Sequence, residues 1–213
     1  YEQILVTYPD GDEVQLRRPI ATASQGSGKR VPVALRATPL LFGWGLLQRV
    51  PARMIDAYHD PEDSNGDGIS GRARQLGDSR GIMGWKNSHA SVGEQVSAAL
   101  FHDMGITTRA HAKAPELSDA ELVSLVDYVS AIGVPDRRFL ADDTSSQLFD
   151  DVGCFQCHVS VMMTSTHADP AFSEQLLWPY SDLVLHDLGP GLADPGDAPD
   201  AAEWRTTPLW GLG

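Results

Sequence analysis

The chain has 213 residues, of which 42% are hydrophobic, and its formal net charge is −13. This composition is ordinary for a folded protein of one or two domains, and no apolar run reaches the ~20 residues that a membrane-spanning helix needs. The acidic charge argues against a nucleic-acid partner, because phosphate binding requires the opposite sign.

The first part of the chain combines a predicted hairpin with an apolar segment. Residues 4–19 alternate apolar and polar positions on either side of a Pro-Asp-Gly turn signal at 9–11, which is typical of a β-hairpin. Residues 40–47 are apolar, and their two glycines permit close backbone approach to a flat cofactor or another helix. Pro51 is then placed to begin a short helix over 52–59.

An Asp/Asn/Gly-rich stretch at 60–71 resembles the first half of a calcium-binding loop. Oxygen ligands would come from the side chains of Asp63, Asn65 and Asp67 and from the carbonyl of Ile69. The twelfth position of such a loop, normally a bidentate glutamate, is Arg74. The same residue types also favour turns, so a calcium site and a metal-free turn both stay open.

Two Ser-x-x-Glu boxes, beginning at Ser91 and Ser118, predict the starts of two amphipathic helices. The first is expected to end at Gly105 and the second before Gly133. A polar boundary at 141–146 precedes a third helix, which leads into Gly153. We therefore expect the main domain boundary between residues 138 and 139.

Cys154 and Cys157, the only cysteines, are followed directly by His158. This Cys-x-x-Cys-His spacing is the attachment signature of covalent haem c, because two thiols on one helical turn reach two vinyl groups of a porphyrin while the next imidazole ligates iron. A zinc site would need a second ligand pair, and no cysteine remains to supply it. A haem-free dithiol oxidoreductase stays an alternative.

Several motifs together resemble the bacterial di-haem oxidoreductases, a group often labelled thiol oxidoreductases and related to the di-haem cytochrome c peroxidases. The motifs are residues 65–72, 84–86 with 94–95, 103–107, 154–158, 180–194 and 203–213. The resemblance implies two facing cytochrome c-like domains with a haem in each, often a calcium ion between them, and a periplasmic location. The first haem motif would then lie before Tyr1 and the closing segment after Gly213, so we expect this chain to be the middle of the family pattern.

The fold expected from this resemblance is mainly α, with cytochrome c-like domains, an N-terminal β-hairpin and long loops around haem. Residues 1–138 would hold the hairpin and the latter part of the first cytochrome domain, with the calcium loop at 60–71. Residues 139–213 would form a truncated C-terminal haem domain.

The function expected is that of a periplasmic c-type haem oxidoreductase, which moves electrons between a small electron-transfer protein and an oxidant such as hydrogen peroxide. Other segments of the same polypeptide, or other subunits, are further candidate partners. A non-catalytic electron carrier or haem-binding module is the alternative from another class. Residues 139–213 contain twelve acidic residues and only one basic residue, Arg205. This excess of acidic residues would either steer a cationic redox partner toward the chain or serve only as a solvated surface.

Individual site residues follow from the same motifs. His158 is the expected proximal iron ligand. His186, Met162, Met163 and Tyr180 are the candidates for the sixth iron ligand within the chain, and a ligand after Gly213 is the alternative. In addition, the resemblance places a catalytic glutamate at the position of Gly93, so the neighbouring Glu94 is a candidate acid although the Ser91 box already explains it. Trp85 is a candidate electron-transfer residue or a core indole.

Overall fold

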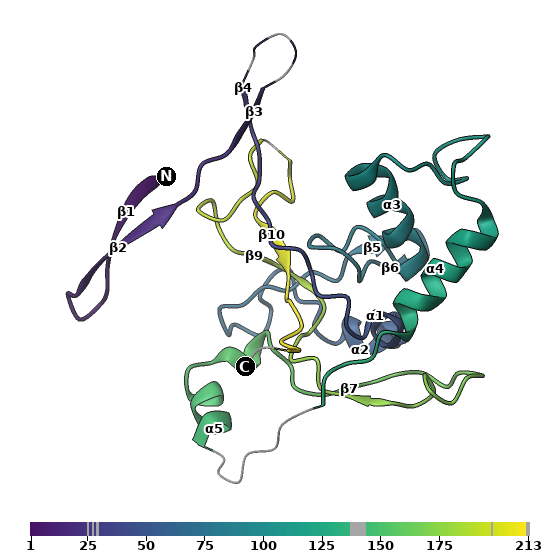
Figure 1. The fold of residues 1–213 in the computed structure, drawn as a ribbon. Helices are drawn as coiled ribbons and strands as arrows, with labels where there is room; N and C mark the ends of the chain where they lie inside the picture. Colours follow the sequence, from purple (N-terminus) through teal and green to yellow (C-terminus); the bar gives the residue numbers. More distant parts are fainter. Residues whose placement is uncertain (25, 27, 29, 137–143, 197, 212–213) are drawn as a thin grey trace. The chain divides into compact units, whose positions relative to one another are not determined.

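The computed structural model describes residues 1–213 except 25, 27, 29, 137–143, 197 and 212–213 (Figure 1). Its secondary structure is mixed, with 23% helix and 18% strand, so the expectation of a mainly α fold is wrong. The described strands form five two-stranded sheets. The physical reason is that much of the sequence after the haem motif is rich in Pro, Gly and Asp, which disfavour helix interiors and leave short local strand pairs.

The chain forms two compact units. The first consists of Tyr1–Thr38 and Gly189–Ala202, and the second of Pro39–Leu188 and Glu203–Gly213. The boundary expected between residues 138 and 139 lies outside the described residues.

The first unit contains two hairpins. Strand β1 (Glu2–Thr7) pairs antiparallel with β2 (Glu13–Arg18), as predicted, and Gly11 at φ 92° closes the turn between them. Strand β3 (Thr22–Ser24) pairs with β4 (Arg30–Pro32). An ion pair between Arg36 and Asp194 joins the two segments of the chain that make up this unit.

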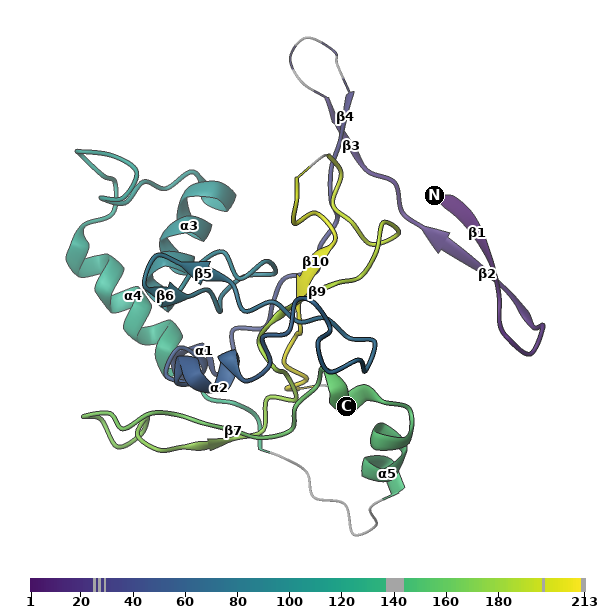
Figure 2. The same cartoon turned by 180° about the vertical axis from the view of Figure 1, so that it is seen from behind.

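Five helices are described in the second unit, and the first four contribute residues to its hydrophobic core, whereas the fifth contributes none. They are α1 (Trp44–Leu47), α2 (Ala52–Asp56), α3 (Val92–Met104), α4 (Asp119–Ala131) and α5 (Thr144–Asp151). Helices α3 and α4 lie side by side in both views (Figures 1 and 2). Gly45 of α1 lies against the carbonyl of Ser130 in α4 and leaves no room for a Cβ atom, so the predicted close backbone approach is made to a helix.

Both predicted helix starts are present. The Ser91 hydroxyl accepts a hydrogen bond from the Glu94 amide, and Ser118 forms a complete reciprocal box with Glu121. Helix α3 ends at Gly105 with φ 72°, as the sequence predicts. These caps define where the two longest described helices begin.

The second unit also contains three antiparallel pairs of short strands among its described residues. They are β5 (Gln75–Leu76) with β6 (Ser79–Arg80), β7 (Met162–Met163) with β8 (Leu176–Leu177), and β9 (Leu185–Asp187) with β10 (Glu203–Arg205). Residues 181–186, which lead into β9, are buried without interruption. Among the described residues, none of the helices has the length and apolar character required to span a membrane.

Candidate functional site

The Cys-x-x-Cys-His segment forms one turn of 3₁₀ helix, η1 (Cys154–Gln156), directly after α5. Gly153 adopts φ 78°, a left-handed conformation that ends α5 and turns the chain. Both cysteines carry free thiols and are half-buried, and the His158 amide donates to the Cys154 carbonyl at 2.9 Å. The local fold therefore keeps both thiols and the imidazole on one short turn.

His158 is oriented by a backbone carbonyl. Its Nδ1 lies 2.6 Å from the carbonyl oxygen of Tyr180. Since a carbonyl only accepts hydrogen bonds, Nδ1 is the donor and the lone pair of Nε2 is left for a metal. Tyr180 itself has φ 49°, an unusual conformation for a residue with a side chain, which is held by hydrogen bonds at the next two residues.

Two backbone hydrogen bonds hold the haem motif against the buried segment 181–186. The Ser181 amide donates to the Val159 carbonyl at 2.9 Å, and the Asp182 amide donates to the Cys157 carbonyl at 3.0 Å. The segment that orients His158 is thus fixed to the turn that carries both thiols.

Apolar side chains around the motif are left exposed in the chain alone. Leu148, Val152 and Phe155 are 60%, 64% and 52% exposed, and α5 has no buried residue. Phe149 packs edge-on against the rings of His158 and Tyr180. Apolar surface next to free thiols and an imidazole with an available nitrogen fits a porphyrin, whose faces are large and apolar.

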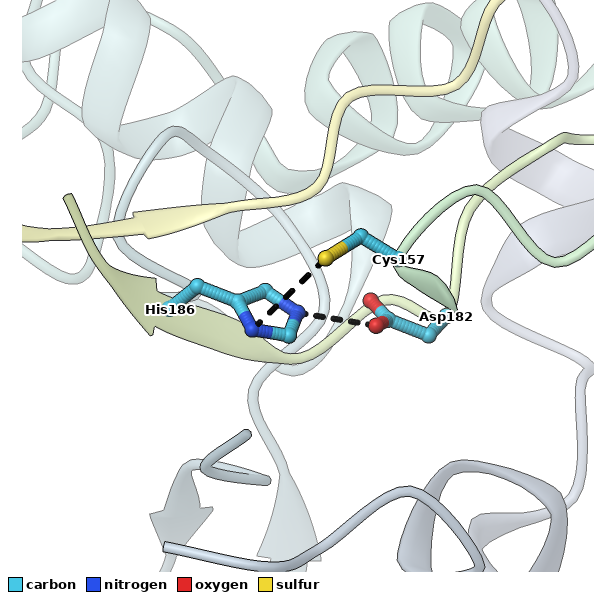
Figure 3. Close-up of side chains that lie close together, drawn as sticks. All are labelled: Cys157, Asp182 and His186. Atoms are coloured by element: carbon cyan, nitrogen blue, oxygen red, sulfur yellow. Dashed lines mark hydrogen bonds and ion pairs between the residues drawn. The ribbon is translucent and has the colours of Figure 1, made fainter. Parts of the chain in front are cut away.

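His186 lies beside Cys157 in a buried polar cluster (Figure 3). Its Nε2 is 2.8 Å from the Asp182 carboxylate, and its Nδ1 is 2.8 Å from the Ser70 carbonyl and 4.0 Å from the Cys157 sulfur. The carboxylate and the carbonyl are both acceptors, so both ring nitrogens donate and the ring is an imidazolium. Burial alone would lower the pKa of His186, but the hydrogen bonds to Asp182 and Cys157 outweigh it and raise the pKa to about 10.

The geometry of His186 bears on its predicted role as distal iron ligand. Both ring nitrogens are engaged, and the ring contacts Cys157. To bind iron, the ring would have to release the Ser70 carbonyl or the Asp182 carboxylate and lose a proton. Its role as a ligand stays a prediction. Met162 is fully buried in the hydrophobic core, whereas Met163 is 44% exposed.

The loop at 60–71 is closed by two backbone hydrogen bonds between Asp60 and Gly71. Within it, the Asp63 carboxylate accepts from the Gly68 amide, the Asn65 side-chain oxygen from the Asp67 amide, and the Asp67 carboxylate from the Ile69 amide. These are contacts of a stable turn. A calcium ion coordinated here stays a prediction.

Glu94 and Trp85 have structural contacts. The Glu94 carboxylate accepts from the Ala90 amide at 2.7 Å at the start of α3. Trp85 is half-buried and packs edge-on against Trp204 at 6.4 Å between ring centroids, and the Lys86 ammonium lies 3.7 Å from the centre of the Trp204 ring. Catalysis by Glu94 and electron transfer through Trp85 stay predictions.

Sequence reasoning missed Asp182 and Arg205, although both are buried. The sequence contains a pattern that could have indicated Asp182, because this acidic residue directly precedes the apolar run Leu183–Leu185 and lies four positions before His186. Arg205 could have been singled out because it is the only basic residue among residues 139–213.

A protein-family model described as "Di-haem oxidoreductase, putative peroxidase" matches residues 1–120 and 108–213, which together span the chain. No curated protein and no solved structure matches the chain.

Proposed function

This chain belongs to the di-haem oxidoreductase family, and we propose that it is a c-type haem oxidoreductase in which Cys154, Cys157 and His158 hold one haem. The two cysteines would form thioether bonds to the porphyrin, and His158 Nε2 would be the iron ligand. Bound haem supplies one-electron redox chemistry. A second haem, which the family name implies, would be held by residues outside this chain.

The hydrogen bond between His158 Nδ1 and the Tyr180 carbonyl carries this proposal. A histidine that ligates a metal through one nitrogen usually donates its other N–H to a carbonyl or carboxylate, which fixes the tautomer and the ring orientation. The His158 imidazole that makes this hydrogen bond follows directly after two thiols at haem-attachment spacing. Neither a dithiol oxidoreductase nor a plain turn requires this orientation of the ring.

The remaining side chains would shield and position the haem ligands. Phe149 packs edge-on against the His158 and Tyr180 rings and would limit the access of water to them. His186 and Asp182 hold a buried charge pair next to Cys157. That pair would keep the second thioether sulfur in place and raise the local polarity on one side of the motif.

Covalent haem attachment is tested by producing the chain in cells that attach haem c. We expect a red protein whose Soret band stays with the polypeptide after denaturation and acid extraction. Replacing both Cys154 and Cys157 by Ser should make the haem fully extractable, whereas His158→Ala should keep it attached but change its ligand-field spectrum. A colourless wild-type protein with two titratable thiols would instead support the dithiol alternative.

For the reaction, we propose electron transfer from a small electron-transfer protein to an oxidant such as peroxide, in the periplasm. The family description as a peroxidase supports this direction of transfer. Trp85 and Glu94 are the candidate electron-transfer and acid residues. Adding hydrogen peroxide to the reduced protein in a stopped-flow instrument tests it: a peroxidase-like enzyme reoxidises rapidly, and a non-catalytic carrier with no open iron site does not.

We also propose that the loop at 60–71 binds calcium, because Asp63, Asn65 and Asp67 supply three side-chain oxygens within one closed turn. Asp67→Ala should then lower both the bound calcium, measured by atomic emission, and the melting temperature in calcium buffer. Asp78→Ala, a change of equal charge outside the loop, should alter neither. Unchanged metal content in Asp67→Ala would rule the site out.

A further inference from the structure

Cys157, Asp182 and His186 form a compact group of side chains that can bind a metal ion (Figure 3). One ligand atom from each of the three lies within 4.8 Å of the other two. Asp182 and His186 are buried and Cys157 is half-buried, so the cysteine is the member of the group that solvent reaches. A thiolate sulfur and an imidazole nitrogen are typical ligands of zinc in proteins.

The imidazole of His186 is held in the orientation of a metal ligand. Its Nε2 lies 2.8 Å from Asp182 Oδ2, and Oδ1 of the same carboxylate accepts from the Val184 amide at 3.1 Å. A histidine that binds a metal through one nitrogen usually donates its other N–H to a carboxylate, which fixes the orientation of the ring. Asp182 is therefore placed to orient the ring from the Nε2 side, and Nδ1 is the nitrogen that can bind an ion.

The Nδ1 atom of His186 lies near two further ligand atoms. The Cys157 sulfur is 4.0 Å away and the Ser70 carbonyl oxygen is 2.8 Å away. A tetrahedral zinc ion, bound to sulfur at about 2.3 Å and to nitrogen at about 2.0 Å, holds these two atoms roughly 3.5 Å apart. A small movement of the Cys157 side chain toward the ring would therefore bring both atoms to coordination distance.

Backbone hydrogen bonds fix the positions of the cysteine and of the carbonyl. The Asp182 amide donates to the Cys157 carbonyl at 3.0 Å, which joins the segment of the thiol to the segment of the orienting carboxylate. Ser70 directly precedes Gly71, which exchanges two backbone hydrogen bonds with Asp60. The ligand atoms are thus held in place before an ion binds, which lowers the entropic cost of binding.

We propose that the haem-free chain binds one Zn²⁺ ion through Cys157 Sγ and His186 Nδ1, with Asp182 as the residue that orients the imidazole. The ion takes the place of the proton that Nδ1 donates to the Ser70 carbonyl. That carbonyl is a weaker third ligand, and water completes the four-coordinate site.

The zinc site does not rest on the proposed haem function, because its ligand atoms all belong to the chain itself. The two sites share Cys157, however. Once this sulfur is a thioether it no longer carries the negative charge of a thiolate, which is the form that binds the ion. Zinc binding and the thioether bond at Cys157 therefore exclude each other, and zinc would keep this thiol from reacting until haem arrives.

The first test uses the reduced wild-type chain without haem. Co²⁺ serves as the visible probe of a tetrahedral zinc site, and we expect a near-ultraviolet charge-transfer band from thiolate to cobalt that one equivalent of Zn²⁺ removes. Zn²⁺ should also protect Cys157, but not Cys154, from alkylation by iodoacetamide. Fragmentation of the alkylated peptide in a mass spectrometer locates the label on one cysteine or the other.

Matched variants identify the ligands. Cys157→Ser should abolish the charge-transfer band, whereas Cys154→Ser, the same change three positions earlier, should keep it. Asp182→Asn should lower the affinity for Zn²⁺ by roughly 10–100-fold, as the loss of an orienting partner usually does. His186→Gln should lower this affinity at least as much, and His158→Ala, which removes the other nearby imidazole, should leave it unchanged.

Three results would overturn the proposal. The first is a wild-type chain with neither a charge-transfer band nor selective protection of Cys157. The second is a loss of zinc affinity in Cys154→Ser or His158→Ala as large as in Cys157→Ser, which would place the ion on the haem motif itself. The third is full zinc affinity in His186→Gln.

The haem-loaded protein separates this proposal from the proposed function. With haem attached, Co²⁺ should give no thiolate band, and a band of undiminished intensity would contradict a site that uses Cys157. A chain that attaches no haem but shows the expected zinc binding would contradict the proposed function alone and would leave the zinc site standing.

Discussion

At the scale of single residues, His186 and Asp182 form a buried ion pair next to Cys157. The two side chains are 10% and 2% exposed, and their nitrogen and oxygen lie 2.8 Å apart. Because the pair is shielded from solvent, removal of one partner leaves a buried charge uncompensated, at a cost of about 3–5 kcal/mol. We therefore expect Asp182→Asn to lower the free energy of unfolding in urea by an amount in this range.

The same pair predicts how stability depends on pH in the haem-free chain. Asp182 and Cys157 raise the folded-state pKa of His186 from 6.5 to about 10 against the effect of burial. A raised pKa means that the folded state binds the proton more tightly, so the contribution is complete below about pH 6.5 and is lost as the pH rises toward 10. Urea unfolding at a series of pH values should show this decline.

Two variants separate this effect from a general alkaline loss of stability. His186→Gln should flatten the decline between about pH 6.5 and pH 10, because no imidazole remains to titrate there. His102→Gln, which replaces an exposed histidine, should leave the decline unchanged. An equally steep decline in His186→Gln would show that other groups cause it.

At the scale of elements, the caps of the helices can be tested one by one. The Ser118 hydroxyl accepts from the Glu121 amide, and the Glu121 carboxylate accepts from the Ser118 amide, which satisfies two helix-end donors. Ser118→Ala should therefore destabilise the chain by about 1 kcal/mol in urea unfolding. Ser124→Ala is the matched control within α4, where the hydroxyl only bonds back to Ala120 and alanine has the higher helix propensity. A loss of stability in the control equal to that in Ser118→Ala would contradict a capping role.

Helix α5 gives a prediction that links the fold to the cofactor. Leu148 is 60% exposed on a helix with no buried residue, beside the turn that would hold haem. Haem attachment should bury this side chain, so Leu148→Ser should cost about 1–2 kcal/mol in the haem-loaded protein and little in the haem-free chain. Val123→Ser in α4, where the side chain is 58% exposed, should cost little in both. Equal effects of Leu148→Ser in the two forms would show that α5 does not contact haem.

The elements that the sequence predicted well are those with local signals. The hairpin follows from alternation around Gly11, and α3 and α4 follow from the boxes at Ser91 and Ser118. The two-residue strands, such as Met162–Met163 in β7, could not be predicted, because pairing over two residues depends on tertiary contacts rather than on periodicity. That is why the mixed composition of the fold was missed.

In the candidate site, too, the residues that form a local sequence pattern could be predicted, whereas the long-range contacts could not. Cys154, Cys157 and His158 are neighbours in the sequence, so the spacing alone predicts them as a unit. The contacts of His186 arise differently: Ser70 is 116 positions away from it, and no local pattern indicates that its carbonyl would meet the ring. Long-range polar contacts of this kind follow from the packing of 181–186 and require the structure.

At the scale of the whole molecule, net charge predicts the class of redox partner. The chain carries −13, and residues 139–213, which include the haem motif, hold twelve acidic residues and one basic residue. A negative electrostatic field attracts a cationic protein and repels an anionic one. Such steering raises the rate of association at low salt by roughly tenfold or more.

We therefore expect the rate of haem reduction by a basic electron-transfer protein to fall by about tenfold as the ionic strength rises from about 10 mM to about 200 mM, since salt shortens the range of the field. An uncharged hydroquinone donor should show almost no dependence. The double variant Asp150→Asn/Asp151→Asn removes two exposed charges next to the haem motif and should slow reduction at low salt. Asp103→Asn/Asp127→Asn removes the same charge from α3 and α4 of the same unit, away from α5 and η1, and should slow it less. Reduction by the basic protein at a rate independent of salt would mean that the acidic residues serve only as solvated surface.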